Sequence, residues 1–425
     1  MKIHIKNGRL VDPKNGIDAQ QDVFIAAGKV VAVGAAPEGF HANRTIDAAG
    51  LVICPGLVDL SARLREPGYE YKATLESEML AAVAGGVTSL VCPPDTDPPL
   101  DEPGLVEMLK YRAKSLNQAR VYPLGALTQK LEGARLTEMA ELHDAGCIGF
   151  SHADVPLSDT LVQMRAMQYA ATFGFTVWLR PQDASLAKDG VAHDGEVASR
   201  LGLPSIPACA ETIALSTILS LARETGARVH ICRLSSREGV ALIRAAKAEG
   251  LPVTCDIAVH HAHLSEMDIG FFDANCHLVP PLRSQRDRDA LRAGLADGTV
   301  DAICSDHTPV DDDAKLLPFA EAEVGATGLE LLLPLTLKWA QETGVSLSDA
   351  IAKITAAPAR ILALDNGHLA AGQHADLCIF DPEQYWKVEP ASLKSQGRNT
   401  PFVGFELQGK VRYTLVDGQV VYEAH

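Results

Sequence analysis

Three polar side chains follow the apolar run 51–60 at alternate positions, namely Ser61, Arg63 and Arg65. Alternate residues of a strand share one face, so these side chains are expected to point the same way. A His-x-His pair at such a place would bind a metal ion, because the neutral imidazole is a metal ligand. Serine and arginine stand here instead. The pattern therefore indicates the scaffold of an active site in which the metal ligands are missing.

Polar residues also follow the other buried runs of the chain. If these runs are the parallel strands of a barrel, the residues that follow them meet at one mouth. They are Asp95, His152, Ala153, Asp154, Arg180, Gln182, Asp183, Arg233, Ser235, Ser236, His260, His261, His263, Asp306 and His307. This set predicts an arginine-rich rim around one prominent carboxylate, Asp306.

The elements that must position these residues form a regular pattern. Short, nearly continuous apolar runs alternate with segments of helical periodicity, and several of these segments end in glycine. The runs are 52–60, 87–92, 120–126, 147–151, 175–180, 227–233, 252–258 and 300–305. Eight such units predict an α/β fold of the (β/α)8 TIM-barrel type.

The two ends of the chain have a different pattern. Residues 3–13, 22–34 and 44–50 have the short strands and glycine turns of a β structure, and so has the chain after about residue 365. We expect one small β-sandwich built from both termini. The predicted domains are therefore 1–52 with 365–425 for the sandwich, and 53–364 for the barrel.

Composition excludes several classes of protein. A formal net charge of −16 argues against a nucleic-acid-binding surface and against an anionic membrane partner. No apolar run reaches the roughly 20 residues that a spanning helix needs, and the amino terminus lacks the apolar core of a signal peptide. The nine cysteines form no C-x-x-C pair and are expected to be core residues. The chain is predicted to be cytoplasmic.

The chain resembles a dihydroorotase of the amidohydrolase superfamily over nearly its whole length. The motifs that carry the resemblance are PGLVDL…LREPG, DTDPPLDEP, GEVASRLGLPSIP, HICRLSSREGVALIRAAKAEGLPVTCDIAVHHAHL, PPLRS, DGTVDAICSDHTP and TGLELLLPL. The resemblance implies a barrel with a sandwich domain and a binuclear zinc site. Active members interconvert N-carbamoyl-L-aspartate and dihydroorotate in pyrimidine synthesis.

The sequence departs from this family at the positions that matter for chemistry. The metal-ligand positions that the resemblance assigns fall on Ser61, Arg63, His152 or Ala153, Arg180, Arg233 and Asp306. Of these only Asp306, which is also the family's general acid/base, keeps the family residue. In the substrate shell Arg65 is kept, whereas Asp95, Val279 and Val310 replace two asparagines and a histidine.

These departures predict that zinc binding is lost. A catalytic zinc needs about three protein ligands, whereas serine is a poor ligand and a permanently charged guanidinium has no lone pair to donate. Arg63, Arg180 and Arg233 would instead bring positive charge to the place of two dications. Without a metal to lower the pKa of a bound water, Asp306 alone cannot support the hydrolytic reaction. We therefore expect no metal and no cofactor.

Two questions about the site stay open at this level. The three arginines either pair with Asp306, Asp95 and Asp183 as a structural plug, with Asp306 as their main counter-charge, or form an anion-binding site. His260, His261 and His263 resemble family positions that are not ligands, and the alternative is that they and Asp306 hold another metal.

Two classes of function follow. The first is a noncatalytic dihydroorotase-like subunit, similar to those that hold aspartate carbamoyltransferase in an active complex, which implies that transferase as the partner in a homo- or hetero-oligomer. The second is an enzyme, either an active dihydroorotase or a related cyclic-amide amidohydrolase with a metal-poor site that uses Asp306. Loss of ligands with retention of scaffold motifs favours the first.

Overall fold

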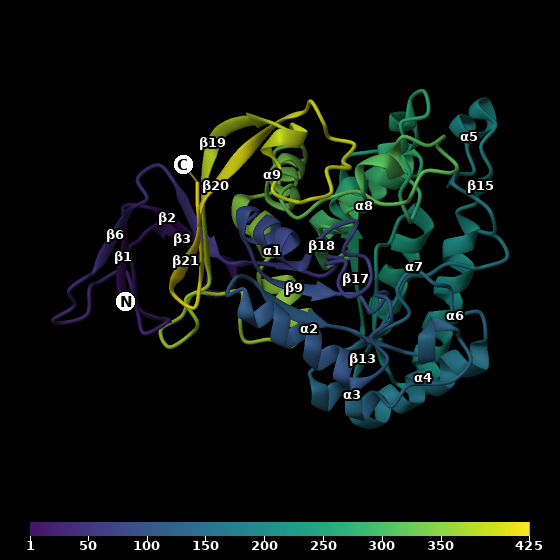
Figure 1. Cartoon of the computed structure of the whole chain (residues 1–425), viewed down its shortest axis with the longest axis horizontal. Coiled ribbons are helices and arrows are strands. Elements are labelled where there is room, and N and C mark those ends of the chain that lie inside the picture. Colours follow the sequence, from purple (N-terminus) through teal and green to yellow (C-terminus); the bar gives the residue numbers. More distant parts are fainter. Residues whose placement is uncertain (425) are drawn as a thin grey trace.

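The computed structural model describes residues 1–424 and consists of a small β domain beside a barrel. Figure 1 shows the β domain, with both chain termini, on one side and the barrel with its helices on the other. The predicted fold class, a TIM barrel with a sandwich built from both ends of the chain, is confirmed. Within the described residues, no helix has the length and apolar character needed to cross a membrane.

The β domain consists of two sheets. The first has the order β5 (Lys29–Val33), β4 (Val23–Ala26), β1 (Lys2–Lys6) and β6 (Arg44–Asp47). The second has the order β21 (Gln419–Glu423), β20 (Glu406–Val416), β19 (Leu377–Lys387), β7 (Val52–Pro55), β2 (Arg9–Asp12) and β3 (Ile17–Gln20). Buried aliphatic side chains of both sheets, among them Ile3, Ile25, Ile53, Leu377 and Leu415, form one core.

One boundary differs from the prediction. Strand β7 (Val52–Pro55) pairs with β19 and β2, so it belongs to the sandwich, and the chain enters the barrel after Pro55 rather than after residue 52. Gly56 separates β7 from the first barrel strand, where a side chain would collide with Thr88 at 2.1 Å. Both strands are fully buried, so their apolar residues run together in the sequence.

The barrel strands all pair in parallel with their neighbours. They are β8 (Leu57–Asp59), β9 (Val87–Cys92), β10 (Arg120–Pro123) continued by β11 (Gly125–Ala126), β12 (Phe150–Ser151), β13 (Thr176–Leu179), β16 (Arg228–Ile231), β17 (Val253–Ala258) and β18 (Ala302–Cys304). A parallel bridge between Ala62 and His307 joins the last strand to the first. Each of the eight predicted runs therefore contains a barrel strand.

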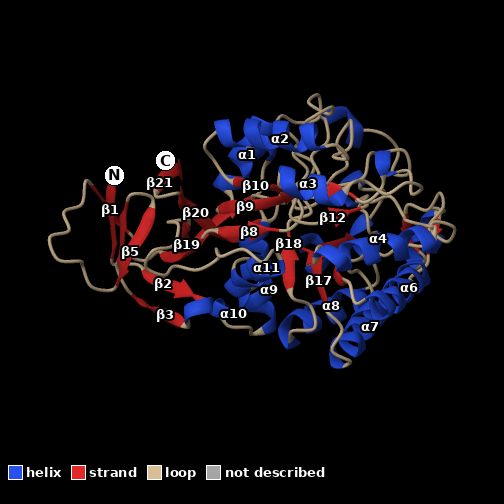
Figure 2. Cartoon of the chain, turned by 90° about the horizontal axis from the view of Figure 1, so that it is seen from below, coloured by secondary structure: helices blue, strands red, loops and turns tan. Residues whose placement is uncertain are grey.

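Helices surround the strands, as Figure 2 shows in a second view. They are α1 (Leu75–Ala84), α2 (Pro103–Ser115), α3 (Met139–Ala145), α4 (Thr160–Phe173), α6 (Cys209–Thr225), α7 (Arg237–Ala248), α8 (Gln285–Asp297), α9 (Leu332–Thr343), α10 (Leu347–Ala352) and α11 (Ala356–Ile361). A short excursion after β13 adds β14 (Ala192–His193), α5 (Glu196–Leu201) and β15 (Ser205–Ile206). Gly174 and Gly226 end α4 and α6 in the left-handed conformation, as the glycine pattern predicts.

The long loop between β19 and β20 ties the two domains together. In Figure 1 this yellow segment reaches over α9 toward the barrel. The Asn399 side chain donates to the carbonyls of Thr308 and Gly325, at 3.0 Å each, and accepts from the amide of Val310 at 3.1 Å. The sandwich domain therefore holds the loop that follows the last barrel strand.

The cysteines agree with the prediction only in part. Seven of the nine are buried, whereas Cys232 is half-buried and Cys209, at the start of α6, is exposed. Cys209 occupies the first turn of an amphipathic helix, and the helix places that position outside the core.

Candidate functional site

Three arginines from three barrel strands converge on one carboxylate, Asp154. Arg63 Nη2 and Arg233 Nη2 each donate to a carboxylate oxygen of Asp154 at 2.6 Å. Arg180 Nε donates to the same carboxylate at 2.8 Å, and its Nη2 reaches the Asp154 carbonyl at 2.8 Å. The predicted arginine cluster therefore exists, and Asp154 is its centre.

The identity of this centre corrects the prediction that Asp306 is the main counter-charge. Asp306 accepts from Arg233 Nη1 at 2.9 Å and lies 3.7 Å from Arg63 Nη1, but it does not contact Arg180 in an ion pair. Asp95 completes the cluster by accepting from Arg63 Nε at 2.8 Å. Three guanidinium groups thus face three carboxylates.

The two central carboxyls differ in their protonation chemistry. Burial alone would raise the pKa of Asp154, but the charges of Arg233, Arg63 and Arg180 outweigh burial and hold that pKa well below its usual range. Burial raises the pKa of Asp306, and Arg233 and Arg63 offset this only in part. The cluster therefore stabilises the ionised form of Asp154 far more than that of Asp306.

Left-handed backbone recurs at two residues of the cluster, Arg233 and Asp306, and at two residues close to cluster members in the sequence, Arg65 and Ala153. Arg65, Ala153, Arg233 and Asp306 have φ angles of 63°, 51°, 53° and 47°. Such angles cost of order 1 kcal/mol or more for residues other than glycine and collect at functional sites. The loops that carry the cluster therefore hold strained backbone at these four positions.

The other predicted ligand positions lie outside the charge cluster. His152 is buried and turned away, with Nε2 at 2.8 Å from Thr128 Oγ1 and Nδ1 donating to the Val155 carbonyl at 2.8 Å. Ala153 has no donor group, and Ser61 is buried beside the barrel strands, where its carbonyl accepts from the amide of His307. Neither His152 nor Ala153 reaches the centre, which Asp154 occupies instead.

Very little space remains between Arg63 and two residues of the predicted substrate shell, Arg65 and Asp95. Arg65 donates from Nε to the Pro309 carbonyl at 2.8 Å, and its guanidinium lies 6.0 Å from the ring of Tyr69. The cavity between Arg63, Arg65 and Asp95 has a volume of about 10 Å³, which is room for one water molecule at most. Val310 is buried and Val279 half-buried.

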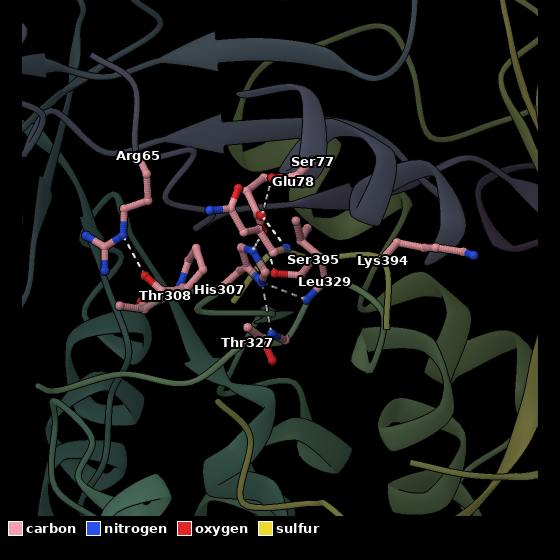
Figure 3. Close-up of polar contacts among 12 residues, drawn as sticks. Arg65, Ser77, Glu78, His307, Thr308, Thr327, Leu329, Lys394 and Ser395 are labelled. Carbon is pink, nitrogen blue, oxygen red and sulfur yellow. Dashed lines mark hydrogen bonds and ion pairs between the residues drawn. The ribbon is translucent and has the colours of Figure 1, made fainter. Parts of the chain in front are cut away.

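A second buried polar group adjoins the cluster, and no sequence pattern points to its centre, Glu78. Figure 3 shows His307 and Glu78 facing each other beside Ser395. His307 Nε2 lies 2.5 Å from Glu78, Ser395 Oγ donates to Glu78 at 2.7 Å, and His307 Nδ1 accepts from the Gly328 amide at 3.1 Å. Burial raises the pKa of Glu78, but His307 and Ser395 outweigh it and lower that pKa. The group joins α1, the last barrel strand and the β19–β20 loop.

The three neighbouring histidines do not form a metal site. His260, His261 and His263 donate from Nε2 to the carbonyls of Thr327, Pro280 and Leu335, at 3.2, 3.0 and 2.8 Å. Each ring therefore uses a nitrogen to satisfy the backbone of a different segment. The alternative in which they bind a metal together with Asp306 has no support in this geometry.

The residues present do not fit a binuclear zinc site. The donor atoms at the expected ligand positions are guanidinium nitrogens, which are cationic, and the carboxylates of Asp154 and Asp306 already accept from them. Across residues 1–424, no three His, Cys, Asp or Glu side chains are placed to share an ion. The chemistry that remains is that of a neutralised ionic cluster.

This misfit gives a prediction for metal content. Protein purified in the presence of zinc should contain well under one ion per chain, because a dication would have to displace Arg63 and Arg233 from Asp154. Elemental analysis after gel filtration measures this directly. Two ions per chain would show that the arginines move aside.

A separate hollow lies beside the cluster. It has a volume of about 190 Å³ and lies between the loops that follow β12 and β13, with Arg180, Gln182 and Gln163 among its lining residues. Arg180 separates this hollow from the charge cluster, because its guanidinium group is hydrogen-bonded to Asp154 and to Gln182.

Solved structures with the same architecture define the class. L-Hydantoinase (dihydropyrimidinase) from Arthrobacter aurescens matches with a TM-score of 0.89 and 26% identity over 99% of this chain and 96% of that one. A D-hydantoinase structure matches with a TM-score of 0.84 at 22% identity, over 100% of this chain and 95% of that one. The fold is thus that of the amidohydrolases with a barrel and a sandwich domain.

Sequence relatives narrow this class. A family model described as "Dihydro-orotase-like" matches residues 50–239. The "Dihydroorotase-like protein" of Pseudomonas aeruginosa is 47% identical over 423 residues, and the "Dihydroorotase" of Geobacter sp. (strain M21) is 42% identical over 427 residues, each with 100% of both chains covered. The chain belongs to the dihydroorotase-like family.

Proposed function

We propose that this protein is a noncatalytic member of its family that acts as an assembly subunit for aspartate carbamoyltransferase in pyrimidine biosynthesis. One observation supports the loss of catalysis: Arg63, Arg180 and Arg233 stand at positions that the family resemblance assigns to metal ligands, and they are neutralised by Asp154, Asp95 and Asp306. Hydrolysis in this fold needs a metal-bound water whose pKa is lowered to about 7. The ionic cluster supplies no such water.

The retained acid/base is also poorly placed to act alone. Asp306 is held in an ion pair with Arg233, and the cavity between Arg63, Arg65 and Asp95 has room for one water molecule at most. A chain that keeps its fold and loses its chemistry acts through contacts, and barrel loops offer a broad surface for them. The choice of the transferase as partner rests on the family resemblance.

An active enzyme is the second candidate. Its support is the raised pKa of Asp306, which suits an acid/base group, and the name "Dihydroorotase" carried by relatives at 42% identity. In that case the arginines would serve as oxyanion stabilisers.

Turnover measurements separate the two candidates. We expect no hydrolysis of dihydroorotate and no cyclisation of carbamoyl aspartate by the purified chain. The double variant S61H/R63H should remain inactive, because Arg180 and Arg233 would still occupy the metal positions and catalytic groups act as a unit. Turnover by the unaltered protein, free of metal, would establish the second candidate.

Co-expression with the transferase catalytic chain tests the assembly role. Size-exclusion chromatography with light scattering should give one hetero-oligomer at micromolar concentration, and the transferase should be more active in it than alone. Separate elution together with equal transferase activity would end the assembly proposal.

A further inference from the structure

A patch of exposed apolar side chains lies on the loops that follow the seventh and eighth barrel strands. Phe271 is 89% exposed and Leu316 is 80% exposed, whereas large apolar side chains are ordinarily covered. We call this surface the mouth patch, and its members are Met267, Phe271, Phe272, Leu316, Leu317 and Val324.

The two loops that carry the mouth patch form one supported surface. Lys315 Nζ donates to the carbonyl of Ala274 at 3.0 Å and to that of Glu323 at 2.5 Å, so it bridges both loops. His277 Nδ1 donates to the Ala322 carbonyl at 2.8 Å, and its ring lies 5.0 Å from that of Phe319. The exposed side chains therefore project from a base that is hydrogen-bonded and packed.

Clustering distinguishes this patch from ordinary exposure. Single apolar side chains scattered on a surface need no explanation, whereas a contiguous group marks an interaction site. The rings of Phe271 and Phe272 lie 5.2 Å apart, edge to face. The hydrogen bond from Lys315 to Ala274 joins this loop to the one that carries Leu316, and phenylalanine and methionine are among the residues enriched in interface cores.

The exposed charge on these two loops is mainly negative. Their exposed carboxylates include Asp268, Asp273, Asp312, Asp313 and Glu321. Lys315 is the one lysine or arginine in segments 264–282 and 308–330, and Lys72, from before α1, pairs with Glu323 at 2.5 Å. The ammonium group of Lys315 is turned inward onto the two carbonyls. An apolar centre with an acidic rim is complementary to an apolar surface ringed by lysine and arginine, and two copies of it would repel each other.

From this surface we infer that the mouth patch is the docking site for the transferase catalytic chain, through a face of that chain with an apolar centre and a basic rim. The inference rests on the proposed assembly function and adds the surface and its chemistry. It also predicts that rising salt weakens the complex, because the rim charges are exposed and screened.

The test is the double variant F271D/L316D in the co-expressed complex. The dissociation constant for the transferase should rise by at least about tenfold, because the central apolar contacts of an interface carry most of its affinity. The melting temperature of the free chain should not change, since both side chains are exposed. Tyr111→Asp is the matched control, because Tyr111 on α2 is an aromatic residue with 77% exposure far from these loops in the sequence.

The outcomes separate this inference from the function on which it rests. If the unaltered chain binds the transferase and F271D/L316D binds equally well, the docking surface is wrong and the assembly role stands. If the unaltered chain does not bind at all, the assembly role fails and the docking site fails with it. Conversion of a self-associated chain to monomers by F271D/L316D, without the transferase, would assign the patch to a second copy and overturn the inference.

Discussion

Replacement of Asp154 by asparagine should lower the free energy of unfolding by about 3–5 kcal/mol, the cost of leaving buried charges without their partner. The variant keeps the shape of the side chain and removes its charge. Arg180 would then have no carboxylate in contact, and Arg63 and Arg233 would share Asp95 and Asp306. Chemical denaturation at neutral pH measures the loss.

Replacement of Asp306 by asparagine should lower the free energy of unfolding by less, about 1–2 kcal/mol, because the cluster does little to stabilise the ionised form of Asp306. Asp18→Asn is the surface control, since Asp18 forms an exposed pair with Arg9 and should contribute at most about 1 kcal/mol. A larger loss for D306N than for D154N would return Asp306 to the centre of the cluster. Equal stability of all three variants would mean that the cluster is open to water.

The sequence predicts the arginines of this cluster and misses its centre for a physical reason. Arg180 and Arg233 lie one and two residues after their strands, and Arg63 follows Ala62, which still pairs in parallel with His307, so the strand directions bring the three side chains to one mouth. Asp154 comes three residues after β12, and the left-handed backbone of Ala153 intervenes. Alternation does not extend through such a turn, so the carboxylate that reaches the centre cannot be chosen from His152, Ala153 and Asp154 by spacing.

The fold was predictable where burial makes a pattern. Parallel strands that are covered on both faces are continuously apolar, and this pattern locates all eight barrel strands. The same property conceals the domain boundary, because β7 of the sandwich and β8 of the barrel are both buried and are separated only by Gly56. The role of Asn399, which joins the domains from residues far along the chain, depends on contacts that no local pattern encodes.

Acid should destabilise the folded chain well above the pH at which carboxylates titrate. Burial lowers the pKa of His260 to about 3 and those of His261, His263 and His277 to about 4, whereas an unfolded histidine has a pKa of about 6.5. Between pH 6.5 and 4 the unfolded chain therefore binds more protons than the folded one at these four positions. Stability due to them is complete above pH 6.5 and falls as the pH is lowered.

Two buried carboxyls act in the opposite direction. Burial raises the pKa of Asp59 and of Glu330 to about 7, so the folded chain holds two protons that the unfolded chain releases above about pH 4. Near pH 5 the four histidines outweigh the two carboxyls by about two protons, which corresponds to about 3 kcal/mol lost per pH unit. Asp154 adds to this pH dependence only below about pH 4, where the unfolded carboxyl takes up a proton while the folded one, whose pKa is depressed, stays ionised.

Urea unfolding at pH 7, 6 and 5 tests this balance. The free energy of unfolding should fall at each step, more steeply between pH 6 and 5, where the unfolded histidines become fully protonated. The variant H261Q should reduce the slope of the free energy of unfolding against pH by the contribution of about one proton. Glutamine can donate to the Pro280 carbonyl as the His261 ring does, but it does not titrate. A free energy that stays level from pH 7 to 5 in the unaltered chain would mean that these four rings are protonated in the folded state, and an unchanged slope in H261Q would remove His261 from the set.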